Sequence, residues 1–148
     1  MPTLFTIGYT RKSLEQFIRL LQGSEVGAVI DVRLRNTSQL AGFSKRDDLA
    51  FLLREGFNIA YEHRPDLAPT PAILDSYKQD GDWRAYEIAF RRLLAERDLT
   101  ATAGRQILDH FHQPCLLCAE PTPEHCHRRL LAEWWAERLS GLEVVHLL

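Results

Sequence analysis

Residues 3–23, TLFTIGYTRKSLEQFIRLLQG, read as a short strand followed by an amphipathic helix, and this unit decides the fold class. Its first five residues are rich in β-branched and aromatic side chains, and Gly8 ends the run. Ser13 and Gln16 form a capping-box pattern, which marks the start of a helix that Gly23 ends. Apolar residues follow the cap at i, i+3, i+4 and i+7, the spacing of one helical face: Leu14, Phe17, Ile18 and Leu21.

The same alternation continues outward from this unit. Further strands are predicted in four apolar runs: GAVIDVR (27–33), FNIAYEHR (57–64), CLLCAE (115–120) and EVVHLL (143–148). Helices are predicted from a cap signal at Ser44–Asp47 to Gly56, between Pro71 and about Phe111, and from Thr122-Pro123-Glu124 to Gly141. Residues 34–42 and the proline-rich segment 65–71 are predicted loops.

This order predicts an α/β fold for residues 1–148. We expect one domain of three layers, in which helices cover both faces of a mostly parallel sheet of about five strands. The length of 148 residues suits a single domain.

Composition narrows the classes of function. Hydrophobic residues make up 45% and charged residues 26% of the chain, which is ordinary for a globular protein. The net charge is −2, which argues against a protein that coats nucleic acid through its overall positive charge. The chain shows no signal-peptide pattern, and no apolar run reaches the roughly 18 residues that span a membrane. Three cysteines, an odd number, suggest reduced thiols. We therefore expect a cytoplasmic protein without a membrane partner.

Polar residues gather where the predicted strands end. Ligands of parallel α/β sheets bind outside the carboxyl ends of the strands, so these residues are the first candidates for a site. They are Gly8, Tyr9, Thr10, Asp31, Arg33, Glu62 to Arg64, and Cys118 to Glu120. The convergence of polar residues on one edge predicts a binding site there, with anions as the expected ligands.

The cysteine segment has three interpretations, of which a metal site is the first. Cys115-x2-Cys118, with Cys126 and His127 behind it, resembles half of a zinc knuckle. Residues three apart in a strand point to opposite faces, and neighbours on a helix diverge, so we expect these side chains to point apart. No second CxxC follows, and we predict neither a metal nor a cofactor.

A reactive thiol is the second interpretation, and packing is the third. Cys118 lies near a strand end and Cys126 in the predicted first turn of a helix, whose dipole and free N–H groups stabilise a thiolate. Buried cysteines are commonly small hydrophobes, which is the favoured reading for Cys115. His127 shares a helical face with Leu130, Leu131 and Trp134, so it is either a rim-of-core histidine or a site residue.

Charged residues beside these cysteines have two readings as well. Glu120 needs a partner if it is buried, and Arg128 is the natural one, through a bidentate pair. Arg128 instead faces an anion if the helix N-terminus is a binding site. Asp31 either belongs to the site or has a structural role, in which it caps a neighbouring helix or pairs with an adjacent arginine.

Three blocks of the sequence resemble a known family. TLFTIGYTRKSLEQFI, VIDVRLRNTSQLAGFS and CLLCAEPTPEHCHRRLLAEW are similar, in this order, to the signature blocks of the domain-of-unknown-function 488 family. The resemblance implies an uncharacterised bacterial or archaeal cytosolic protein whose signature residues share one site, and it supplies no reaction. The chain departs from the family pattern at Tyr9, often a histidine, and at Leu67-Ala68-Pro69, often Leu-Gly-Gly.

A second, weaker resemblance concerns arrangement alone. VIDVR is similar to an early strand of rhodanese-like domains, in which a catalytic cysteine ends a later strand and leads through a loop into a helix that carries an arginine. Cys118 would occupy that position. The loop here is longer and lacks the compact glycine-containing cradle of those domains.

Two functions remain open at this point. The first is a small enzyme in which Arg33 and Arg128 hold an anionic small molecule. Protons would be moved by Glu120, Asp31 or His127, and the nucleophile would be Cys118 or Cys126. The second is a module that binds nucleic acid or phosphate without chemistry, through basic residues interleaved with aromatics. Those residues are Arg33, Arg35, Lys45, Arg46, His63, Arg64, Tyr9, Phe43 and Tyr61. Adjacent tryptophans at 134 and 135 leave a homodimer contact open.

Overall fold

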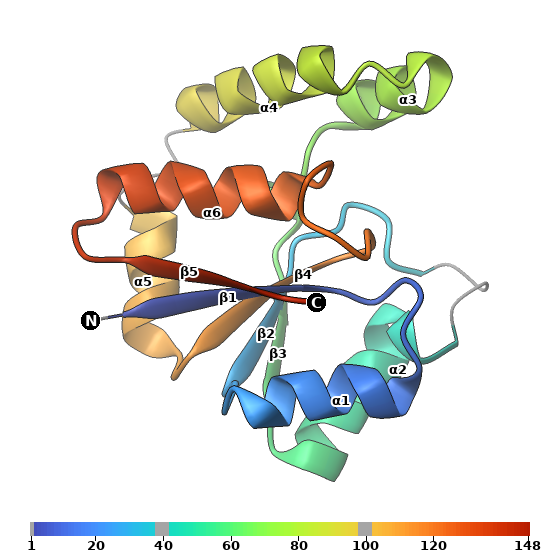
Figure 1. Ribbon diagram of the computed structural model, residues 1–148, viewed down its shortest axis with the longest axis vertical. Helices are drawn as coiled ribbons and strands as arrows, with labels where there is room; N and C mark the ends of the chain where they lie inside the picture. Colours follow the sequence, from blue (N-terminus) through green and yellow to red (C-terminus); the bar gives the residue numbers. More distant parts are fainter. Residues whose placement is uncertain (1, 38–41, 98–101) are drawn as a thin grey trace.

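The computed structural model describes residues 2–37, 42–97 and 102–148 and contains one sheet of five parallel strands (Figure 1). The strands pair in the order β3-β2-β4-β1-β5, and every pairing in the sheet is parallel. Their bounds are β1 Thr3–Gly8, β2 Ala28–Asp31, β3 Ala60–His63, β4 Pro114–Cys118 and β5 Glu143–Leu147. The predicted parallel sheet is confirmed.

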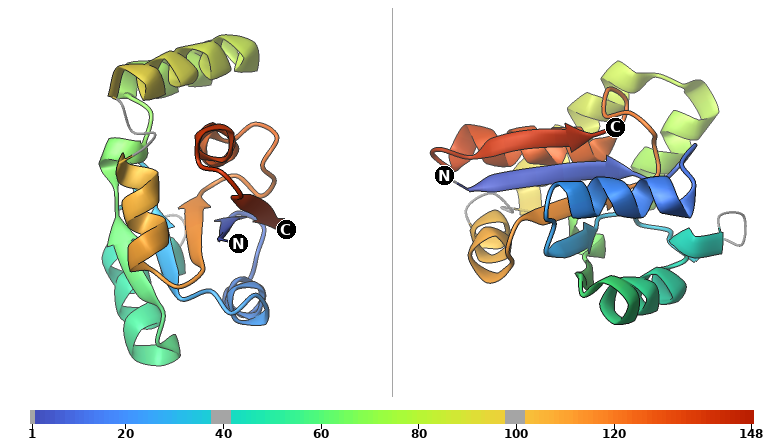
Figure 2. Two further views of the ribbon diagram at one scale, coloured as in Figure 1. Left: turned by 90° about the vertical axis from the view of Figure 1, so that its left-hand side faces the viewer. Right: turned by 60° about the horizontal axis from the view of Figure 1, so that its bottom comes forward.

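Helices cover both faces of this sheet, as predicted (Figures 1 and 2). α1 and α2 pack on one face, whereas α5 and α6 pack on the other, and α4 lies across α6 with α3 beside it. Bounds are α1 Leu14–Gly23, α2 Arg46–Phe51, α3 Pro71–Asp80, α4 Trp83–Arg97, α5 Thr102–His110 and α6 His127–Arg138. Short 3-10 turns at Gly42–Ser44 and Pro65–Leu67, and a π-helical turn at Leu52–Gly56, complete the described elements.

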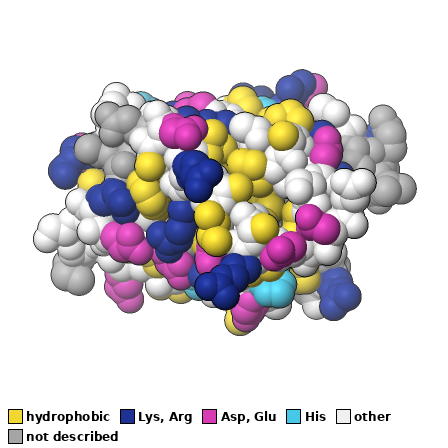
Figure 3. Space-filling model, turned by 90° about the horizontal axis from the view of Figure 1, so that it is seen from above, with side chains coloured by type: hydrophobic (Ala, Val, Ile, Leu, Met, Phe, Trp, Pro, Cys, Tyr) yellow, Lys and Arg dark blue, Asp and Glu magenta, His cyan; other side chains and the backbone are white. Residues whose placement is uncertain are grey.

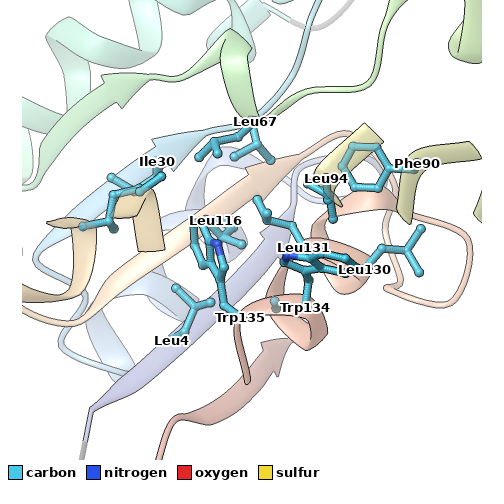
Figure 4. Packing of buried hydrophobic residues seen from close by; sticks show 14 of the residues in the cluster. Leu4, Ile30, Leu67, Phe90, Leu94, Leu116, Leu130, Leu131, Trp134 and Trp135 are labelled. Atoms are coloured by element: carbon cyan, nitrogen blue, oxygen red, sulfur yellow. The ribbon is translucent and has the colours of Figure 1, made fainter. Parts of the chain in front are cut away.

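Two hydrophobic cores lie on the two sides of the sheet. Alternate residues of β4 enter different cores: Cys115 and Leu117 face α1 and α2, whereas Leu116 faces α6. Trp135 of α6 is fully buried and lies between the sheet and α5, close to Leu4 (Figure 4). This alternation decides which β4 side chains reach the α6 side, and Cys118 is one of them.

The predicted helix starts are confirmed in part. The capping box of α1 is formed, with Ser13 and Gln16 bonding reciprocally, and α3 begins at Pro71 behind a Thr70 cap. The cap predicted at Ser44 is wrong, because Ser44 is buried in a 3-10 turn and Lys45 precedes α2 without a side-chain cap. The predicted loop at 34–42 is confirmed over residues 34–37, and residues 38–41 lie outside the described part.

The predicted start of the last long helix is wrong. Residues 121–126 form bends and a turn, in which the Cys126 N–H donates to the Pro123 carbonyl, and α6 begins only at His127. Pro123 therefore stands in a turn rather than at the first helical position. Cys126, at the N-cap, has extended backbone angles. Because α6 begins later than predicted, the turn at residues 121–126 brings the chain back beside the end of β4.

Within the described ranges, no helix combines the length and the apolar character that crossing a bilayer requires.

Candidate functional site

Asp31 and Arg33 form a buried ion pair at the carboxyl end of β2. Arg33 donates to the carboxylate twice, from Nε to Oδ1 and from Nη2 to Oδ2, each at 2.8 Å. The backbone N–H of Arg33, the Asn36 amide and the Tyr61 hydroxyl also donate to Asp31. Burial opposes ionisation of Asp31, but the hydrogen bonds and charge of Arg33 outweigh it and place its pKa below the ordinary value.

The structure thus brings Asp31 together with a neighbouring arginine, one of its two predicted readings. Its carboxylate is fully buried and saturated with donors. Arg33 also donates to the Ser44 carbonyl at 2.7 Å and lies 5.2 Å from the centre of the Tyr9 ring. Asp31 therefore orients Arg33.

Cys118 and His127 face each other across the gap between β4 and α6. Cys118 Sγ lies 3.4 Å from His127 Nδ1, and His127 Nε2 lies 2.6 Å from the Val32 carbonyl oxygen. Because a carbonyl only accepts, Nε2 must carry the ring proton, which leaves the Nδ1 lone pair of the neutral ring toward the thiol. The Cys118 S–H is then the donor and His127 the acceptor.

Cys126 completes a cluster of three side chains. The donor atoms of Cys118, Cys126 and His127 all lie within 4.8 Å of one another, and all three residues are buried. Hydrogen bonding from the neighbouring Cys126 thiol and Ala119 N–H lowers the pKa of Cys118 despite its burial. Burial and the proton held toward Cys118 raise the pKa of Cys126 well above the ordinary thiol value.

The predicted divergence is right for Cys115 and Cys118, which lie on opposite faces of the sheet, and wrong for Cys126 and His127, which both approach Cys118. Cys115 is fully buried in the core beneath α1 and α2, where burial raises the pKa of its thiol. Cys126 and His127 converge on Cys118 because Cys126 is an extended N-cap residue rather than part of the helix. Two thiols and an imidazole are the donor types of a three-ligand zinc site with one open position. The geometric argument against a metal site therefore does not hold for Cys118, Cys126 and His127.

Arg128 is completely buried beneath the carboxyl end of β1. Its Nη1 donates to the Glu120 backbone carbonyl at 2.7 Å, and its Nε donates to Thr6 Oγ1 at 3.3 Å. The predicted pair between Glu120 and Arg128 is therefore made through the backbone, while the Glu120 side chain is exposed. Arg128 Nη2 has no hydrogen-bond partner among the described residues.

Gly8 is needed where β1 meets the loop after β4. A Cβ built on Gly8 would lie 1.6 Å from the Glu120 carbonyl oxygen, so any side chain would force the two segments apart. The two segments stay joined beyond the strands, because Tyr9 N donates to Cys118 O and Thr10 N to Ala119 O. Gly8 thus shapes the floor of the site by letting the backbones approach.

A cavity of about 210 Å³ opens beside the cysteine cluster, between the strand ends and the α3–α4 pair. Six of the ten predicted site residues line it: Tyr9, Arg33, Cys118, Glu120, Cys126 and His127. Asp31, Gly8 and Arg128 do not line it, and Thr10 lines a neighbouring cavity with Arg11 and Lys12. The carboxyl edge therefore does bring most of the predicted residues to one place.

The far wall of this cavity was not predicted. It consists of aromatic and basic side chains from α3 and α4, together with His125 and the loop after β2. Trp83 stacks on Tyr86 at 4.8 Å and on His125 at 5.0 Å between ring centres. The lining residues that no prediction named are Leu34, Leu74, Tyr77, Lys78, Trp83, Tyr86 and His125. Tyr86 and Phe90 stand four residues apart in the sequence, a helical spacing that indicates core packing alone.

Comparison with known proteins supports the family resemblance and adds no reaction. The model of the family described as domain of unknown function DUF488 matches residues 13–135, which include the Asp31–Arg33 pair and the whole cysteine cluster. No curated protein and no solved structure matches the chain. The chain belongs to the domain of unknown function DUF488 family.

Proposed function

We propose that this chain is an enzyme in which the Cys118 thiol is the nucleophile and His127 takes its proton. The observation that carries the proposal is the 3.4 Å contact between Cys118 Sγ and His127 Nδ1 at the wall of a cavity. A nucleophile beside a base that a third group orients is the general plan of covalent catalysis. Here the Val32 carbonyl is the third group.

The surroundings of Cys118 favour its thiolate. The thiol of Cys126 and the N–H of Ala119 both donate toward its sulfur. The first residues of α6, a twelve-residue helix, lie against it, and a helix N-terminus stabilises negative charge. Each of these groups interacts more strongly with the ion than with the neutral thiol, so a reactive thiolate is the expected result.

The cavity suits a small anion that carries an apolar or ring-shaped part. Its volume of about 210 Å³ is below the roughly 300 Å³ at which typical ligand pockets begin. Arg33, Arg35 and Lys78 bring positive charge to its wall. Asp31 and Asp75 balance the two arginines, so Lys78 supplies most of the uncompensated charge.

The three residues predicted to transfer protons differ in their positions relative to the cavity and the nucleophile. Asp31 is a positioning residue, since it bonds Arg33 and does not reach the cavity. Glu120 is exposed at the rim of the cavity and is the one carboxylate among its lining residues. His127 is the group in contact with the nucleophile. We assign the proton at sulfur to His127.

Several observations speak against the alternative of a nucleic-acid module. Arg35, Arg46 and Arg64 of the proposed basic groove each form an ion pair with a nearby carboxylate. On the face seen from α3 and α4, acidic, basic and hydrophobic side chains are interspersed rather than gathered into one basic stripe (Figure 3). A single-strand binding groove needs a continuous positive track.

Alkylation of the native protein with two reagents of similar size tests the proposal. Iodoacetate carries a negative charge and iodoacetamide does not, and peptide mass spectrometry reports each cysteine separately. We expect Cys118 to react at least about tenfold faster than Cys115. The thiolate is the reacting form, and lowering the pKa of a thiol by one unit raises its thiolate fraction about tenfold. The ratio of the iodoacetate rate to the iodoacetamide rate should exceed that of the unfolded protein at Cys118 alone.

The variant Lys78→Gln separates the charge of the cavity from the reactivity of the thiol. Lys78 is exposed, so its replacement leaves the fold intact. It should lower the preference of Cys118 for iodoacetate and leave the iodoacetamide rate unchanged. The proposal is wrong if all three cysteines react only as fast as the protein unfolds.

A further inference from the structure

We propose that Cys118 and Cys126 form a dithiol–disulfide couple that reduces small anionic disulfides bound in the cavity. This inference rests on the proposed function, since it needs Cys118 as the attacking thiol, and it adds a resolving residue and a substrate class. The free thiols lie within 4.8 Å of each other and line the same cavity.

The positions of the two residues allow a bond between them. A disulfide has a sulfur–sulfur length of about 2.05 Å, so the sulfurs need to approach by no more than about 2.8 Å. Cys118 is the last residue of β4, whereas Cys126 is an extended residue before α6, at the end of the turn-forming segment 121–126. The bond would thus close a short loop without breaking a helix or a strand.

The two thiols have different surroundings, which assigns their roles. Cys118 contacts the His127 base, with 3.4 Å between Sγ and Nδ1. Cys126 lies within 4.8 Å of both groups and is the less exposed thiol, at 2% against 6% for Cys118, and its burial raises the pKa of its thiol. An attacking thiol that ionises first and a second thiol that ionises after the first has reacted is the order that a two-step exchange requires.

The exchange balances in atoms and electrons. The Cys118 thiolate attacks one sulfur of the substrate R–S–S–R, the substrate S–S bond breaks, and RS⁻ leaves with the proton that His127 held. Cys126 then gives its proton to His127, and its sulfur attacks Cys118. A second RS⁻ leaves and takes that proton. The protein has lost two electrons and two protons, and the products are two molecules of RSH. An external low-molecular-weight thiol, as the reductant, restores both protein thiols.

Charge and shape of the cavity select the substrate. Lys78, which supplies most of the uncompensated positive charge of the wall, favours a carboxylate on the disulfide, and the volume of about 210 Å³ favours a small molecule over a folded protein. Cys115 takes no part, because it lies on the opposite face of the sheet in the other core. It therefore provides a matched control.

A metal ion is the competing occupant of the same cluster. Cys118, Cys126 and His127 have zinc-type donor atoms, and a metal would remove the proton from both thiols alike. The contacts are unequal, since the imidazole contact at 3.4 Å is made to Cys118. This inequality favours thiol exchange, and metal content becomes one outcome of the test.

The test uses the full chain with 2,2′-dithiodiacetate, an anionic disulfide, and with the neutral 2-hydroxyethyl disulfide of similar size. Intact mass and released thiol are measured, after the metal content of the purified protein. We expect the wild-type protein to release two thiols per chain, to lose the mass of two hydrogens, and to react faster with the anionic disulfide. Cys126→Ser should stop at a mixed disulfide on Cys118, and Cys115→Ser should behave as the wild type.

Each contrary outcome overturns a different statement. If the wild-type protein keeps a mixed disulfide on Cys118, the couple is refuted while the nucleophile stands. If Cys118 does not react although alkylation shows it to be reactive, the substrate class is refuted. If Cys118 is inert to the alkylating reagents and to the disulfides, the proposed function fails as well. One tightly held zinc ion per chain refutes the couple in favour of a metal site. The wild-type stoichiometry decides the matter even if a variant folds poorly.

Discussion

Replacing Asp31 by asparagine should destabilise the protein more than the loss of an ordinary hydrogen bond. The carboxylate is fully buried and accepts from Arg33, Asn36 and Tyr61. Asparagine keeps the shape but loses the charge, and its NH₂ group must face one of these donors. Arg33, itself buried, is then left without a counter-ion.

The expected cost follows from the breaking of a buried ion pair. Removal of one partner from such a pair costs about 3–5 kcal/mol, because the remaining charge stays desolvated. Domains of this size have a free energy of unfolding of about 5–15 kcal/mol, so the change removes a large part of it. With a urea m-value of about 2 kcal/mol per molar, a loss of about 4 kcal/mol lowers the midpoint by roughly 2 M.

Urea unfolding followed by tryptophan fluorescence measures this loss. Asp75→Asn is the matched control, since it breaks the exposed pair with Arg35 and should cost less than about 1 kcal/mol. Tyr61→Phe removes one donor from Asp31 and should fall between the two. A loss of less than 1 kcal/mol in Asp31→Asn would refute the reasoning that the pair organises this strand end.

Three further predictions concern acid, backbone approach and the base. The pKa of Asp31 is lower in the folded protein than in the unfolded chain, so its ionised form stabilises the fold above an unfolded pKa of about 3.9. This stabilisation is lost as the pH falls toward the folded pKa. The acid-dependent loss of stability should therefore be smaller in Asp31→Asn than in the wild-type protein. Gly8→Ala should cost more than about 3 kcal/mol in urea unfolding, because its Cβ meets the Glu120 carbonyl at 1.6 Å, whereas Gly23→Ala, with nothing within 4 Å, should be neutral; equal costs would contradict the close approach. His127→Gln keeps a donor for the Val32 carbonyl but removes the Nδ1 acceptor, so alkylation of Cys118 at neutral pH should slow about tenfold; an unchanged rate would exclude His127 as the base.

The strands and their order of appearance could be read from the sequence because their signals are local. The capping box at Ser13 and the apolar run that ends at Asp31 each predict an element without knowledge of its neighbours. The start of α6 was missed because Thr122-Pro123-Glu124 imitates a helix start, while the chain turns there and begins the helix at His127. That error of a few residues hid the convergence of Cys126 on Cys118.

The site was predictable where topology alone determines it. Parallel strands end at one edge, which is why Tyr9, Arg33 and Cys118 reach one cavity. The opposite wall depends on how α4 lies across α6, a tertiary contact that no local pattern encodes, so Trp83 and Lys78 were missed. The predicted bidentate pair of Glu120 with Arg128 was wrong, because the Glu120 backbone carbonyl, rather than its carboxylate, binds Arg128.

The central claim is that Cys118 is an activated nucleophile, and its alkylation rate against pH tests that claim most directly. The native protein is labelled with iodoacetamide at a series of pH values on both sides of the ordinary thiol pKa of about 8.5, and each cysteine is followed by mass spectrometry. Reactivity should rise with pH through the pKa of the attacking thiol. We predict that Cys118 titrates below the free-thiol value of about 8.5 and that Cys115 and Cys126 remain slow. A Cys118 that titrates at or above that value, or that reacts no faster than Cys115, would contradict the account.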